Sequence, residues 1–162
     1  MVHILDPKRD VASLRVAIAR STYHSWATGR MLEGAVDRWR RLGGRDENLV
    51  VADAAGTWEL PAVARGFAER GEVDALVALG VVIRGETDHF EYICQGVTRA
   101  LADLTSRTGI PVGLGVLTCD NAEQVKARTG GEAGNKGAEA MGAAVETALM
   151  IRAVSAWRPG EG

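Results

Sequence analysis

Four short apolar segments, separated by helical patterns, sharply narrow the folds open to this chain. The segments span residues 14–19, 49–52, 74–83 and 112–117. They lack the polar alternation of strands with one solvated face, so both faces of each strand should be buried. Buried strands that alternate with helices predict an α/β fold, a three-layer α/β/α sandwich with a central four-stranded parallel sheet.

The helices between these strands are predicted from apolar residues at helical spacing and from their end signals. The pair Gly43-Gly44 stops the first helix, Pro61 opens the second, and Gly71 ends it. Asn121 begins a short helix, and a glycine-rich loop over residues 130–134 precedes the last one. The predicted helices span residues 26–42, 61–71, 87–107, 121–128 and a final segment that ends near residue 157.

Length and composition favour one soluble domain. The 162 residues suit a single domain over 14–158, with an N-terminal arm at 1–13 and a C-terminal tail at 159–162. The net charge of −2 and the lack of a long apolar segment argue against nucleic-acid and membrane partners. Cys94 and Cys119 show no CxxC spacing, so we expect reduced thiols and a cytoplasmic location.

The unusual residue clusters of the chain all follow strands. Right-handed crossovers place the carboxyl ends of parallel strands at one edge of the sheet, where ligands bind. Tyr23 and His24 follow the first strand, and Thr118 is expected just after the fourth. The other two clusters are residues 56–59 and 81–89. The pattern therefore predicts a binding site at this edge.

The segment Gly85-Glu86-Thr87 is a candidate phosphate cradle. It lies at a strand-to-helix turn, where free backbone N–H groups and the helix dipole attract anions. The alternative is a plain helix cap made by Thr87. His89 follows in the first helical turn and is either a structural histidine or a proton-transfer residue beside the anion.

Two aromatic residues and a carboxylate complete the candidate edge. Tyr23 and Trp58 either stack on a flat heterocycle or pack in the ordinary way. Glu59 either caps the following helix or accepts hydrogen bonds from a ligand. The sequence contains no P-loop, no metal-ligand spacing and no nucleophile motif, so metal and covalent catalysis are poorly supported.

Several motifs are spread over residues 14–155. The most specific is Val82-Ile83-Arg84-Gly85-x-Thr87-x-His89. The other segments are residues 32–35, 56–61, 79–81, 111–112, 115–118, 123–124 with 128, and 135–137. Together they resemble the motifs of the 6,7-dimethyl-8-ribityllumazine synthase family. The resemblance implies a flavodoxin-like transferase of riboflavin biosynthesis. It would condense 5-amino-6-(D-ribitylamino)uracil with 3,4-dihydroxy-2-butanone 4-phosphate to give the lumazine, phosphate and water, without cofactor or metal.

The resemblance also implies a role for each matching residue. His89 would be catalytic and move protons. Gly85, Glu86, Thr87 and Arg128 would bind the phosphate, with support from Lys136. The residues implied to bind the pyrimidine and its ribityl chain are Tyr23, Thr57, Trp58, Glu59, Val81, Val82, Ile83 and Leu114.

Family resemblance further implies a homo-oligomer with active sites shared between subunits. Leu114 and Arg128 would come from a neighbouring chain, in a pentamer or in an icosahedral shell (a 60-mer). Riboflavin synthase is a candidate partner. The sequence leaves two alternatives to the enzyme: a lumazine- or flavin-binding homologue and a shell-forming homologue with weak turnover. The retained His89 and Arg128 argue against both.

Overall fold

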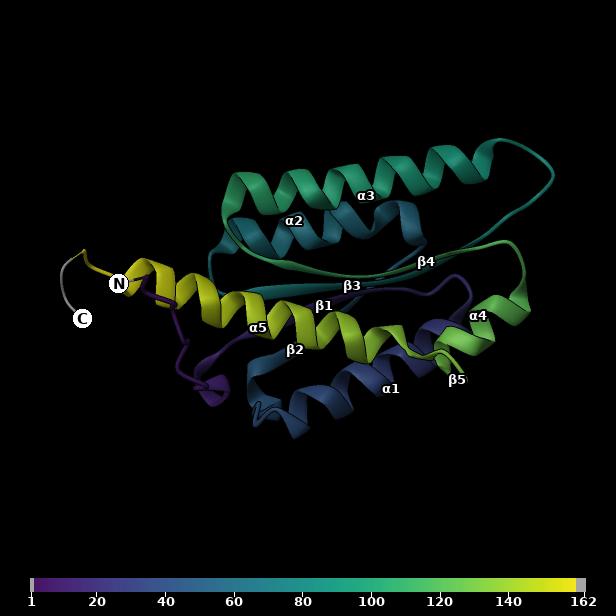
Figure 1. Cartoon of the computed structure of the whole chain (residues 1–162). Coiled ribbons are helices and arrows are strands. Elements are labelled where there is room, and N and C mark those ends of the chain that lie inside the picture. Colours follow the sequence, from purple (N-terminus) through teal and green to yellow (C-terminus); the bar gives the residue numbers. More distant parts are fainter. Residues whose placement is uncertain (1, 160–162) are drawn as a thin grey trace.

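The computed structural model describes residues 2–159 and consists of one parallel sheet between two layers of helices (Figure 1). The strand order is β2-β1-β3-β4, and every neighbouring pair is parallel. The strands are β1 (Val16–Ser21), β2 (Leu49–Ala54), β3 (Ala75–Ile83) and β4 (Val112–Cys119). The predicted four-stranded sandwich is thereby confirmed.

Each face of the sheet is covered by a pair of long helices (Figure 1). One pair is α1 (Ser25–Arg41) and α5 (Lys136–Ala156), and the other is α2 (Leu60–Arg70) and α3 (His89–Thr108). The short helix α4 (Ala122–Arg128) follows β4. Single 3-10 turns occur at Val11–Ser13, Asp46–Asn48 and Thr57–Glu59.

Two apolar cores fill the space between the layers. Ile18 and Val77 project from the sheet toward Met31 of α1 and Met141 of α5. The opposite core is lined by small residues of β1 and by side chains of α2 and α3, among them Leu60 and Leu101. Burial on both faces explains why the strands read as continuous apolar runs.

Several predicted boundaries were wrong by a few residues. The first strand is Val16–Ser21 rather than 14–19, because Leu14 closes the preceding 3-10 turn through its N–H to Val11 O. Thr118 does not follow the fourth strand but lies inside it, since β4 pairs with β3 as far as Cys119.

Two further corrections concern segments next to the candidate site. Helix α3 begins at His89, with Asp88 as its N-cap, rather than at residue 87. The predicted glycine-rich loop is a small hairpin formed by β5 (Thr129–Gly131) and β6 (Gly134–Asn135). The positive φ angles at glycines 130 and 134 allow this tight reversal.

The predicted arm is partly held against the domain. Val11 is buried, and the carbonyl of Ala12 accepts hydrogen bonds from Arg45 Nε and Asn48 Nδ2. The arm and tail boundaries otherwise remain predictions, and residues 160–162 of the predicted tail lie outside the described residues.

Candidate active site

The carboxyl edge of the sheet contains a notch beside β3. Strand β1 pairs with β3 only as far as Leu79, whereas β3 continues to Ile83 along β4. The 3-10 turn Thr57–Glu59 occupies part of the space that β1 leaves. Backbone groups of β3 that face away from β4 therefore lie next to this turn.

Thr57 anchors the turn to β3. Its buried hydroxyl donates to Val81 O at 3.1 Å and accepts from Val81 N at 3.2 Å. Gly80 makes this possible, because a Cβ there would lie 2.8 Å from Thr57 Oγ1. The main-chain groups of Val81 are thus already paired within the chain.

Ile83 presents backbone groups that no neighbouring strand uses. In a parallel strand, successive residues direct their N–H and C=O groups to opposite sides. Leu76 and Arg84 both donate toward the β4 side, to Pro111 O and Cys119 O. Val82 lies an even number of residues from both, so its backbone groups also face β4. Those of Ile83 face the notch. Ile83 can therefore bind a planar amide or imide through two adjacent main-chain groups.

Aromatic side chains flank the notch with their rings largely open to solvent. Tyr23 is 67% exposed, and its ring meets that of His24 edge-on at 4.6 Å. Trp58 is 56% exposed and packs one ring edge over Gly96 of α3, where a Cβ would collide with it. Both aromatics can stack on a flat ligand without rearranging the core.

Glu59 carries the one carboxylate of this turn. Its side chain folds back over Gly56 and makes no capping hydrogen bond to α2. The structure thus does not support the capping alternative. Because the described residues provide no cationic partner for Glu59, its oxygens are available to hydroxyl or N–H donors of a ligand.

The candidate phosphate cradle, Gly85–Thr87, lies on the exposed surface between β3 and α3. A Cβ at Gly85 would meet nothing within 4 Å, so an anion can approach this backbone. Thr87 Oγ1 accepts a long hydrogen bond of 3.4 Å from His89 N. His89 is the first residue of α3, and its exposed ring has no hydrogen-bond partner within residues 2–159.

Leu114 and Lys136 lie together, but away from the notch. Both line a hollow along the outer edge of β4, between α3 and α5. Leu114 pairs with Ala78, which lies five residues before Ile83. At a rise of about 3.3 Å per residue, Leu114 is therefore roughly 16 Å from the carboxyl end of β3. One chain therefore does not bring these two residues to the cradle.

Arg128 ends α4, the short helix after β4 that leads into the β5–β6 hairpin packed against α1. Its Nη1 donates to Gln124 O at 3.0 Å, and no carboxylate pairs with it in the described part of the chain. Its charge also opposes the rise that burial causes in the pKa of Cys119. Arg128 is therefore a half-buried cation available to an anion.

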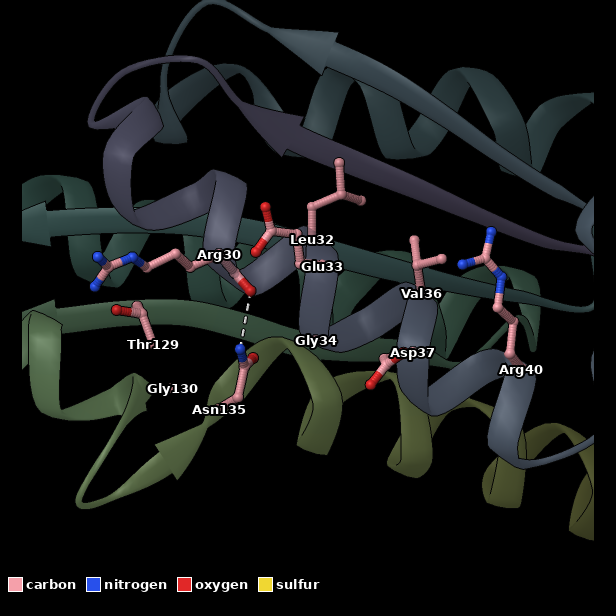
Figure 2. A pocket seen from close by; sticks show the side chains of 10 residues that line it. All are labelled: Arg30, Leu32, Glu33, Gly34, Val36, Asp37, Arg40, Thr129, Gly130 and Asn135. Atoms are coloured by element: carbon pink, nitrogen blue, oxygen red, sulfur yellow. Dashed lines mark hydrogen bonds between the residues drawn. The ribbon is translucent and has the colours of Figure 1, made fainter.

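A hollow of about 840 Å³ over α1 and the β5–β6 hairpin contains none of the predicted site residues (Figure 2). Figure 2 shows Asn135 pointing toward α1, where its Nδ2 donates to Arg30 O at 2.9 Å. Its Oδ1 caps α5 by accepting from the N–H groups of Gly137 and residue 138. Gly34 leaves room for this side chain. Gly34 and Asn135 therefore fix the position at which α5 begins, and with it the position of Lys136.

Within residues 2–159, no group of three or more His, Cys, Asp or Glu side chains is placed to hold a metal ion. None of the helices there combines the length and apolarity needed to cross a membrane.

The sheet order, the helix layers and the notch define a flavodoxin-like α/β protein with its candidate site at the carboxyl edge. A family model for 6,7-dimethyl-8-ribityllumazine synthase matches residues 13–152. The chain therefore belongs to the 6,7-dimethyl-8-ribityllumazine synthase family.

Proteins of this name are similar over nearly the whole chain. The Streptomyces coelicolor protein is 48% identical over 153 residues, which is 93% of each chain. The Anaeromyxobacter dehalogenans protein is 47% identical over 88% of each chain. The Thermus thermophilus protein is 43% identical over 93% of this chain and 96% of its own.

Sequence reasoning missed one feature of this edge, the role of Arg84. In the sequence Arg84 is one residue of a motif, whereas in the structure it contacts Phe90, Glu91 and Asp120. The spacing from Arg84 to Glu91 gives no helical signal, because a turn intervenes. Asp120 becomes a neighbour only through the β3–β4 register.

Proposed function

We propose that this chain carries out the reaction of its family. It condenses 5-amino-6-(D-ribitylamino)uracil with 3,4-dihydroxy-2-butanone 4-phosphate, and releases 6,7-dimethyl-8-ribityllumazine, phosphate and water. The reaction is a transferase step of riboflavin biosynthesis. The observation that carries this proposal is the family match over residues 13–152, which includes every residue of the carboxyl-edge notch.

The pyrimidine substrate occupies the notch in this proposal. Ile83 offers it main-chain N–H and C=O groups, and Tyr23 and Trp58 stack on its ring or line its ribityl chain. Glu59 accepts hydrogen bonds from the ribityl hydroxyls. Thr57 and Val82 act indirectly, since the Thr57 hydroxyl is bonded to β3 and the backbone of Val82 faces β4.

The phosphate-bearing substrate lies over the cradle. Gly85, Glu86 and Thr87 provide main-chain N–H groups at the start of α3, where the helix dipole favours an anion. His89 moves protons as the imine forms and as phosphate leaves, which typically contributes about 10²–10⁴-fold to a rate. The Glu86 side chain is exposed, so its charge can turn to solvent and away from the phosphate.

A neighbouring subunit completes the site. Leu114 and Lys136 open onto the outer edge of β4, and Arg128 on α4 has no carboxylate partner among residues 2–159. A second copy docked against the first can bring these three residues to the exposed half-site, in a pentamer or in a larger icosahedral shell. Arg128 then pairs with the phosphate, while Leu114 covers the pyrimidine and Lys136 supports the anion.

Two inactive variants test the reaction and the shared site together. His89→Ala and Arg128→Ala should each lose most lumazine formation, followed by absorbance after the two substrates are mixed. Co-assembled at equal amounts, they should recover about a quarter of wild-type activity, because one site in four then joins two intact halves. No product from the wild type would refute the function. Inactive mixtures that contain both subunits would refute only the shared site.

We further propose a cytoplasmic location and riboflavin synthase as a partner. Cys94 and Cys119 are free thiols, which suits a reducing compartment. Riboflavin synthase would take up the lumazine product. Co-purification of the two proteins from a soluble lysate at low salt tests this association.

A further inference from the structure

Arg84 forms a three-way clamp at the end of β3. Its Nη1 lies 2.6 Å from Glu91 Oε1, and its Nε lies 2.8 Å from Asp120 Oδ1. The guanidinium carbon sits 4.2 Å from the centre of the Phe90 ring. One side chain thus joins the end of β3, the first turn of α3 and the segment after β4. The planar fork of arginine, unlike a lysine ammonium, can serve all three partners at once.

The clamp touches the cradle of one proposed site and, through α4, the Arg128 that the same chain would contribute to a neighbouring site. Glu91 lies two residues after His89, and Arg84 itself immediately precedes the cradle. On the other side, Asp120 N donates to Gln124 Oε1 at 2.8 Å. The carbonyl of Gln124 then accepts from Arg128 Nη1. A continuous set of contacts therefore runs from the cradle to Arg128.

Charge gives the clamp a second effect. Four carboxylates belong to the cradle or to the residues next to it: Glu86 is part of the cradle, Asp88 follows it, and Glu91 and Asp120 pair with Arg84. Arg84 pairs with two of them, and this pairing lowers the pKa of Asp120 below its usual range. Without Arg84, unpaired negative charge beside the cradle would repel an incoming phosphate.

We propose that Arg84 is a positioning residue that holds the phosphate cradle in place, neutralises the carboxylates beside it, and so sets the affinity for the phosphate-bearing substrate. The inference rests on the proposed function, because it takes Gly85–Thr87 and Arg128 as the phosphate-binding groups. The ion pairs of Arg84 are exposed, and such pairs contribute little to global stability. The loss of Arg84 should therefore weaken phosphate binding far more than it weakens the fold.

Arg84→Met and Arg84→Lys test this role, with Arg40→Met as the matched control. Arg40 also donates to a carboxylate through two nitrogens, Nε and Nη2. Its partner is the exposed Asp46, and this pair lies at the carboxyl end of α1. Initial rates are measured against each substrate in turn, and inhibition by inorganic phosphate is measured alongside. In Arg84→Met we expect KM for the phosphate substrate and Ki for phosphate to rise about tenfold.

The other properties of Arg84→Met should hardly change. We expect kcat and KM for the pyrimidine to stay within about twofold of wild type, and Tm to stay within a few degrees of it. Arg84→Lys keeps the positive charge but lacks the planar fork, so its KM for the phosphate substrate should lie between those of wild type and Arg84→Met. Asp120→Asn removes one arm and should cause part of the same rise. In the double variant with Arg84→Met, the rise in KM should be smaller than the product of the two single rises.

The possible outcomes separate the two proposals. An unchanged phosphate KM in Arg84→Met, with an active wild type, overturns the positioning role alone. Equal rises in both KM values together with a large fall in Tm would also overturn it, because they would indicate a general structural role. A wild type that forms no lumazine would remove the proposed function itself. If Arg84→Met does not fold, Arg84→Lys and Asp120→Asn carry the same test.

Discussion

Thr57→Val should destabilise the chain although it barely changes side-chain shape. The Thr57 hydroxyl makes two hydrogen bonds to the backbone of Val81, at 3.1 Å and 3.2 Å. Both residues are buried, with 6% and 2% exposure, so valine would leave an N–H and a C=O without partners. Buried polar groups that lose their partners cost about 1–3 kcal/mol each. Partial hydration from the open notch offsets part of this cost, so we expect a loss of about 2–3 kcal/mol.

Thermal and denaturant unfolding measure this loss at one fixed protein concentration, since assembly shifts apparent stability. For a domain of this size, Tm should fall by roughly 5–10 °C. Thr57→Ser keeps the hydroxyl and should lose only about 1 kcal/mol for the missing methyl. Thr98→Val is a matched control, because the Thr98 hydroxyl bonds only to carbonyls of its own helix. It should stay within about 0.5 kcal/mol of wild type.

The outcome that contradicts this reasoning is specific. If Thr57→Val and Thr57→Ser are equally stable, the hydroxyl does not hold the turn to β3. If Thr98→Val loses as much unfolding free energy as Thr57→Val, then threonine-to-valine changes are costly in general. The loss in Thr57→Val would then not come from the buried backbone of Val81.

Three further substitutions test the notch and the packing around it. Thr57→Ala frees the backbone of Val81 for a ligand and should lower KM for the pyrimidine; an unchanged or higher KM contradicts this. Gly113→Ala should cost about 1–3 kcal/mol in denaturant unfolding, because its Cβ would collide with the backbone of α5. Gly29→Ala, with open space around its Cβ, should instead stabilise by up to about 1 kcal/mol.

His24→Asn should stabilise by about 0.5 kcal/mol, because His24 has a φ of 58°, which asparagine tolerates better. Burial lowers the pKa of His24, so the folded state favours the neutral ring and stability falls as the pH drops below about 6.5. Asparagine should remove this part of the pH dependence between pH 7.5 and 5.5; an identical slope would count against it.

Much of the candidate site was predictable because parallel strands end at a common edge. Tyr23, Trp58 and His89 each follow a strand, so sequence order alone placed them on that edge. The pairing state of backbone groups was not predictable. Val81 and Ile83 read alike in sequence, yet the Thr57 hydroxyl takes the groups of Val81 and leaves those of Ile83 facing the notch.

The sequence by itself determined the sandwich, because uninterrupted apolar strands between amphipathic helices can bury both faces only in a covered parallel sheet. It also determined the motif that leads from β3 into α3. Only the tertiary structure decided that Leu114 lies far from the cradle and that Arg84 joins Glu91 to Asp120. Both results depend on the register between β3 and β4, which brings residues about 36 positions apart side by side and which no local pattern encodes.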